Sequence, residues 1–136
     1  MILDTQCMFS DDQAITVTAN STNIIDLGND GSEVQALNQK GELELVVQVS
    51  SADLASGTSV KASLYSSDSS TMNGEAVVIE TAAIAEADLV AGYYFKLGKL
   101  PRIDAQYLRL TYTVVGTFDA GAITAGLNLD RQTNAQ

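Results

Sequence analysis

Apolar and polar residues alternate strictly through the last quarter of the chain. Apolar side chains occupy every second position from Leu108 to Val114 and again from Ile123 to Leu129. Because successive side chains of a strand point to opposite faces of a sheet, each run predicts a strand with one buried and one solvent-facing side. The pattern therefore favours antiparallel strands at residues 106–115 and 121–130.

Similar runs recur through the rest of the chain, separated by turn-forming residues. Further strands are expected at residues 14–18, 23–27, 42–50, 60–66, 76–83 and 93–97, with one helical turn at 85–91. Polar loops rich in turn formers are expected at residues 28–41 and 66–74. About eight short strands without a long helical pattern predict an all-β fold, a jelly-roll or Greek-key β-sandwich of antiparallel strands. A closed eight-stranded barrel is the competing geometry.

The length of the chain points to one domain. Its 136 residues can bury a hydrophobic core without disulfides, and the sequence shows no linker and no internal repeat. We expect an N-terminal arm at residues 1–12, a single β-sandwich domain at 13–130 and a loose polar tail at 131–136. The single cysteine, Cys7, cannot form an internal disulfide and is expected to be a small, buried or half-buried apolar residue.

The charge of the chain bears on its partners. The formal net charge of −10 disfavours nucleic acid and anionic membranes, because both bind cationic surfaces. No apolar run is long enough to span a bilayer, and the start of the chain lacks the features of a secretory signal. We therefore expect the protein to be made in the cytoplasm and used without export. Four of the seven basic residues fall between Lys96 and Arg109, which predicts a small basic patch on an otherwise acidic surface.

The residue types in the chain argue against an enzyme. Histidine is absent, which excludes histidine-dependent triads and histidine-ligated metals, and one cysteine cannot build a thiolate cluster. A glycosidase would need two carboxylates across a sugar-binding cleft, and the absence of tryptophan disfavours such a cleft. Residues 26–31 resemble the start of a calcium loop, but Gly28 and Leu37 stand where that loop requires oxygen ligands, so only a weak site of another kind stays open. We expect no catalytic, cofactor-binding or metal-binding residues.

Three tyrosines occupy positions that the alternation places on outer faces. These are Tyr65, Tyr94 and Tyr107. Exposed tyrosine is common in protein interfaces and also stacks on sugars, whereas a purely structural role would be a cross-strand pair at a sheet edge. A protein interface and a carbohydrate-binding platform are both compatible with the pattern.

Segments at both ends of the chain resemble the jelly-roll cement, or decoration, proteins of tailed-bacteriophage heads. The matching segments are Met1–Asp4, Phe9–Thr16, Ser21–Gly28, Tyr107–Val114 and Ala120–Leu127. The resemblance implies a structural virion protein on the outer surface of the capsid that bridges adjacent major capsid protein subunits and stabilises the shell. It also implies association with further copies of itself, as a homodimer or homotrimer.

Two groups of residues become candidates for capsid or subunit contacts. In the N-terminal arm, the apolar Ile2, Leu3 and Phe9 are expected to extend along the shell or a sister subunit by strand augmentation. Near residue 100, Tyr94 and the basic patch are expected to face acidic groups of the shell. The basic residues of that patch are Lys96, Lys99 and Arg102. The alternatives are a jelly-roll carbohydrate-binding module, a tail or baseplate structural component and, last, an enzyme with two carboxylates of unequal pKa.

Overall fold

The computed structural model describes residues 8–26, 44–50, 52–95, 97, 100 and 105–128. Within these residues the chain forms short strands and a single turn of 3₁₀-helix, the all-β composition that the sequence predicts. The strands are β1 (Met8–Ala14), β2 (Ala19–Asn20), β3 (Ile25–Asp26), β4 (Glu44–Val49), β5 (Ser59–Ser67), β6 (Ala76–Glu80), β7 (Ile84–Ala85), β8 (Tyr107–Val115) and β9 (Ala122–Asn128), and the 3₁₀-helix is η2 (Glu86–Asp88).

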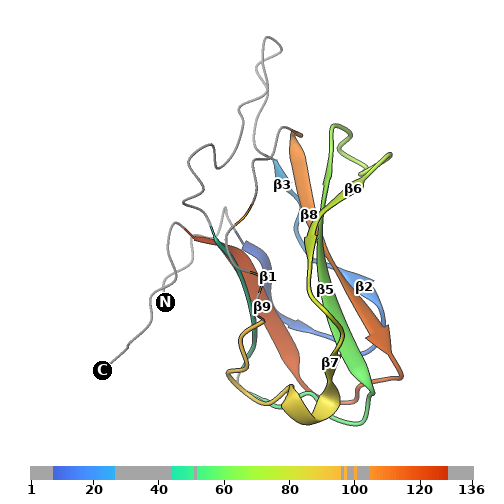
Figure 1. Ribbon diagram of the computed structural model, residues 1–136, viewed down its shortest axis with the longest axis vertical. Helices are drawn as coiled ribbons and strands as arrows, with labels where there is room; N and C mark the ends of the chain where they lie inside the picture. Colours follow the sequence, from blue (N-terminus) through green and yellow to red (C-terminus); the bar gives the residue numbers. More distant parts are fainter. Residues whose placement is uncertain are drawn as a thin grey trace.

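The strands form two antiparallel sheets that pack face to face (Figure 1). One sheet has the order β1-β9-β4, and an isolated bridge between Gln48 and Tyr94 adds the segment around Tyr94 to the far side of β4. The second sheet has the order β2-β8-β5-β6, with β3 also paired to β8 and β7 also paired to β5. The predicted β-sandwich is therefore confirmed, and the two sheets are distinct, as in a sandwich and not in a closed barrel.

The connectivity is that of a jelly roll. β2 and β3 act as one interrupted strand along β8, and β6 and β7 act as one along β5. With the bridge at Tyr94, the described chain then contains eight runs that cross repeatedly between the sheets. The first run, β1, lies beside the last, β9, in the three-stranded sheet. Eight antiparallel runs in two sheets are the architecture of the jelly roll.

The core lies between the two sheets and contains the apolar positions that the alternation places inward. On the four long strands these buried residues are Leu45, Val47, Val49, Val60, Ala62, Leu64, Leu108, Leu110, Tyr112, Ile123, Ala125 and Leu127. Burying one large aliphatic side chain stabilises a fold by roughly 1.5–3 kcal/mol. The hydrophobic effect on these strands therefore holds the sheets together, and the strand register decides which residues contribute to it.

A chain of hydrogen bonds also crosses the core between the sheets. The Ser10 hydroxyl on β1 donates to Gln13 Oε1 at 2.7 Å, so the 2.8 Å contact between Ser10 and Tyr112 on β8 has the tyrosine hydroxyl as donor. Gln13 Oε1 also accepts from the backbone N–H and the hydroxyl of Thr22, both at 3.0 Å. Burial raises the pKa of the Tyr112 phenol well above its ordinary value, while a hydrogen bond donated by the Ser10 hydroxyl to the ionised phenolate acts in the opposite direction.

The N-terminal part of the domain differs from the prediction. A strand was expected at residues 14–18, but β1 runs from Met8 to Ala14, and Phe9 is completely buried in the core. The register of β1 against β9 shifts twice, and Asp12 has a left-handed φ of 51°. These irregularities interrupt the alternation that would have revealed the strand. Residues 8–12, expected in the arm, therefore belong to the sandwich, and the domain begins no later than Met8.

Smaller differences concern the middle of the chain. The expected strand at 93–97 is reduced to the bridge at Tyr94, the helical turn expected at 85–91 is η2, and the strand expected at 76–83 is divided into β6 and β7. Val46 and Ser63 lie on outward positions of β4 and β5 but are buried. The expected loop at 28–41, the tail at 131–136 and Cys7 lie outside the described residues.

The turns at one end of the sandwich are tightly packed. Ala55 and Ala120 form an isolated bridge, and the ring of Phe118 lies so close to Gly57 that a Cβ there would sit 2.5 Å from it. Gly121 has a φ of +100°, and a Cβ there would lie 2.8 Å from the backbone of Leu54. Only glycine fits both positions without displacement of the neighbours.

Candidate interaction surface

The outer face of the six-stranded sheet carries the ion pairs Arg109–Glu75 and Lys61–Glu80 together with several hydrogen bonds between polar side chains. The outward positions of β5 and β8 lie directly opposite one another, with Tyr65 facing Arg109, Ser63 facing Thr111 and Lys61 facing Thr113. These side chains come from the polar half of the alternating pattern, so their place on this face follows from the same periodicity that builds the core.

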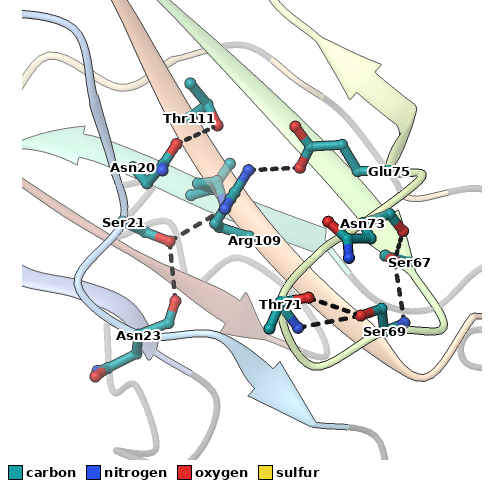
Figure 2. A network of polar contacts seen from close by, with 11 residues as sticks. Asn20, Ser21, Asn23, Ser67, Ser69, Thr71, Asn73, Glu75, Arg109 and Thr111 are labelled. Carbon is teal, nitrogen blue, oxygen red and sulfur yellow. Dashed lines mark hydrogen bonds and ion pairs between the residues drawn. The ribbon is translucent and has the colours of Figure 1, made fainter.

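Arg109 is at the centre of the first ion pair on this face. Its Nη2 lies 2.5 Å from Oε2 of Glu75, the residue just before β6, and Figure 2 shows the guanidinium reaching across the sheet to that carboxylate. The Arg109 side chain is 16% exposed and Glu75 is 30% exposed, so the pair is only partly screened by water. Nε of Arg109 is buried and has no hydrogen-bond partner, which offsets part of the favourable interaction.

A second ion pair lies further along the same face. Lys61 Nζ on β5 is 2.9 Å from Oε2 of Glu80 on β6, and the side chains are 35% and 44% exposed. Ser63 also donates to Glu80 Oε2 at 3.4 Å. Pairs with this exposure contribute about 0–1 kcal/mol, so the contact orients the two side chains more than it stabilises the fold.

Short polar side chains connect this face to the neighbouring turns. Thr111 donates to Asn20 at 3.0 Å on β2, and Ser21 continues the ladder on β8 where β2 and β3 are interrupted, because its hydroxyl accepts from the Leu110 N–H (Figure 2). At the other edge, the turn that follows β5 is closed by the Ser67 hydroxyl, which donates to the Asn73 carbonyl at 2.6 Å. The face is therefore held by contacts within the sheet from edge to edge.

Most of the predicted contact residues lie outside the described residues. These are Ile2, Leu3, Lys96, Lys99 and Arg102. Phe9 is described, and it belongs to the core, so it is not available as an exposed contact in the arm. Tyr94 lies in the segment beside β4, half-buried, with its hydroxyl donating to the Leu45 carbonyl at 3.5 Å.

The three tyrosines do not form one platform. Tyr65 and Tyr107 lie on the outer face of the six-stranded sheet, where Tyr107 is opposite Ser67 and Tyr65 is opposite Arg109. Tyr94 is attached to the other sheet. A sugar-stacking surface that uses all three residues is therefore not formed within this fold, whereas the pair on β5 and β8 remains available at one surface.

The remaining features concern metals and membranes. Among the described residues, no group of three or more Cys, Asp or Glu side chains is placed to hold a metal ion, and Asp26 is the only member of the calcium-like segment 26–31 that the structure describes. The described part of the chain also contains no helix of the length and hydrophobicity needed to cross a membrane.

Sequence reasoning did not identify the ion pairs of the outer face. Alternation places Arg109 outward on β8, but the approach of Glu75 depends on the turn between β5 and β6, whose shape the spacing does not reveal. A search for acidic residues at strand ends next to an outward arginine would have suggested the pair.

Comparison with known proteins identifies the family of the chain. No curated protein matches the chain. The family model described as Bbp16 matches residues 9–127, which spans the strands from β1 to β9 apart from Met8 and Asn128 at the two ends. This match covers most of the chain, so the protein belongs to the Bbp16 family, a phage-associated family.

Proposed function

We propose that the protein is a structural, non-enzymatic component of the phage virion that binds the outer surface of the capsid. In this role it bridges adjacent major capsid protein subunits, associates with further copies of itself and stabilises the shell. The observation that carries the proposal is the match to a phage-associated family over nearly the whole sandwich. The resemblance of both ends of the chain to jelly-roll cement proteins supports the finer assignment.

The physical properties of the fold support an adhesive role. Two sheets share a continuous core, a polar chain from Tyr112 to Gln13 connects them, and tightly packed turns close one end. Such a rigid body can transmit load between two attachment points with little deformation. Weak contacts repeated in many copies on a closed lattice add up to strong retention through multivalency.

A binding experiment with phage heads tests the proposal. Purified protein is mixed with heads from particles that lack it, and the mixture is sedimented. We expect the protein to saturate a fixed number of sites per head and to raise the temperature at which heads release DNA. Protein that stays in the supernatant, or that binds without any change in head stability, would contradict the cement role.

A tail or baseplate component is the second candidate, because the family match identifies a phage protein without its location in the particle. Electron microscopy of particles labelled with an antibody against the protein separates the two assignments. Label distributed over the head supports the capsid role, and label confined to the tail supports the alternative.

A further inference from the structure

The edges of the two sheets differ in whether their backbone N–H and C=O groups already form hydrogen bonds with another part of the chain. At β1, the Asn23 N–H donates to the Phe9 carbonyl at 3.0 Å. At β4, the Val49 N–H donates to the Tyr93 carbonyl at 2.9 Å, and the segment around Tyr94 covers the strand. At β2, the Asn20 carbonyl accepts from Gln13 Nε2 at 2.9 Å. Three edges are therefore occupied by other parts of the same chain.

β6 is the open edge. In the sheet order β5 lies between β8 and β6, and among the described residues no hydrogen bond reaches Ala76–Glu80 from the side away from β5. The ladder to β5 ends at Thr81, whose N–H donates to the Ala62 carbonyl and whose hydroxyl accepts from the Ala62 N–H. By the alternation of antiparallel ladders, the backbone groups of Glu80, the residue next to Thr81, then point away from β5.

The side chains of β6 favour an added strand. The strand reads Ala-Val-Val-Ile-Glu, without the lysine or proline that commonly protects a sheet edge, and Val77 is 50% exposed. One protective device is present, since the register against β5 shifts between Leu64 and Tyr65. This irregularity confines regular pairing to a few residues and predicts modest affinity for an isolated peptide.

The charges around β6 indicate which kind of added strand could pair with its open edge. On the outer face the side chains nearest the open edge are Glu75, Val77 and Glu80, while the cations that pair with the carboxylates, Arg109 and Lys61, lie further in on β8 and β5. An added strand therefore meets carboxylates first. A second copy of β6 would bring carboxylates against carboxylates between chains that each carry a net charge of −10.

We propose that β6 accepts an extended segment of another protein as an additional strand, and that this segment presents lysine or arginine to Glu75 and Glu80 with small apolar residues between them. Backbone hydrogen bonds would supply the affinity and the charged neighbours the selectivity. The identification of that partner with a capsid protein rests on the proposed function, whereas the open acidic edge does not.

A peptide experiment without phage components tests the surface. The full chain is titrated with a short synthetic peptide of alternating lysine and valine, and with a second peptide that has glutamate in place of lysine. Amide hydrogen exchange and NMR chemical shifts are followed residue by residue. We expect the lysine peptide to protect the amide of Glu80 and to shift the resonances of the neighbouring β6 residues, and the glutamate peptide to leave them unchanged.

Matched charge reversals separate a β6 site from general attraction to an acidic protein. Glu80→Lys alters the edge, and Asp88→Lys changes the net charge by the same amount in the exposed η2. We expect Glu80→Lys to weaken binding of the lysine peptide by about tenfold and Asp88→Lys by less than about twofold. Unfolding midpoints of both variants establish that they remain folded.

Three results would overturn the inference: no protection at β6, protection at another surface, or equal weakening by the two variants. Sedimentation of the same variants with heads gives an independent reading. If wild-type protein does not bind heads, the proposed function fails while the peptide result still decides the β6 site. If heads bind both variants equally and the peptide leaves β6 unprotected, only the β6 inference fails.

Discussion

At the level of single residues, the buried phenol of Tyr112 makes the stability of the fold depend on pH. Its folded pKa lies above the ordinary value because the ring is buried between the sheets, where the charged form is poorly solvated. A group with a raised folded pKa contributes its full stability below the unfolded pKa, which is about 10 for tyrosine, and loses that contribution as the pH rises further. High pH should therefore act on the core through this residue.

The pH dependence of unfolding tests this property. Between about pH 10 and pH 11 the free energy of unfolding should fall by up to about 1.4 kcal/mol from Tyr112 alone. Tyr112→Phe should lower stability near neutral pH by about 0.5–1.5 kcal/mol and remove that part of the fall. Urea denaturation across the pH range measures both effects. Tyr65→Phe, on the outer face, is the control that should retain the fall, and an identical pH profile for both variants would contradict the assignment.

Glycine substitutions test the packing of the closed end. Gly121→Ala combines a left-handed φ of +100° with a Cβ 2.8 Å from the backbone of Leu54. Gly74 also has a positive φ, of +67°, but a Cβ there meets nothing within 4 Å. We expect Gly74→Ala to cost about 1 kcal/mol from backbone strain and Gly121→Ala to cost about 1–3 kcal/mol more from overlap. Thermal and urea unfolding compare the two, and equal losses would show that the turn relaxes freely.

At the level of elements, the alternating pattern identifies the long strands that have apolar residues on one face and polar residues on the other. The expected strand at 60–66 is β5 at Ser59–Ser67, and that at 106–115 is β8 at Tyr107–Val115. The pattern fails at β1, because the left-handed Asp12 and two register shifts interrupt the period of two. It also cannot reveal which edges are closed, because that depends on contacts such as Gln13 with Asn20, between residues in different sheets.

The N-terminal arm gives a prediction at this scale. Because Phe9 is buried in the core, the arm is now taken to end before Met8. Because β1 begins at Met8, removal of residues 2–7 leaves every described strand in place. We expect the shortened chain to unfold with the same cooperativity as the full chain but to lose attachment to heads, since Ile2 and Leu3 are the proposed arm contacts. Circular dichroism and sedimentation with heads provide the two measurements. Unchanged occupancy of heads would contradict a role for the arm in attachment.

At the level of the whole molecule, charge controls how the protein approaches its partners. The chain carries a net charge of −10, and the described basic residues Lys61 and Arg109 are each paired with a carboxylate of the same sheet. Any cationic contact with an acidic shell must therefore come mainly from other basic residues, of which Lys96, Lys99 and Arg102 form the predicted patch. The open edge of β6, by contrast, presents acidic groups, so the two proposed contacts attract partners of opposite charge.

Salt dependence tests the basic patch. Reversal of Lys96, Lys99 and Arg102 to glutamate should weaken attachment to heads, and the loss should be larger at low than at high ionic strength, because exposed charge pairs are screened within about 10 Å at 0.1 M salt. Binding isotherms on heads at several salt concentrations provide the measurement. The control is Asp88→Lys, which changes a charge in η2 and leaves both the patch residues and β6 unaltered. If the loss of attachment is the same at all salt concentrations, the patch does not act by electrostatic attraction.

The pairing of the first strand with the last has a practical consequence. Met8 of β1 is opposite Gly126 of β9, so the chain enters the described sandwich and leaves it at neighbouring points of one sheet. A circular permutant that joins residue 136 to residue 1 and opens between Ser70 and Thr71, both at the surface, should keep every strand of the fold. Fusions placed directly before Met8 and directly after Asn128 should, for the same reason, begin at neighbouring points of the same sheet.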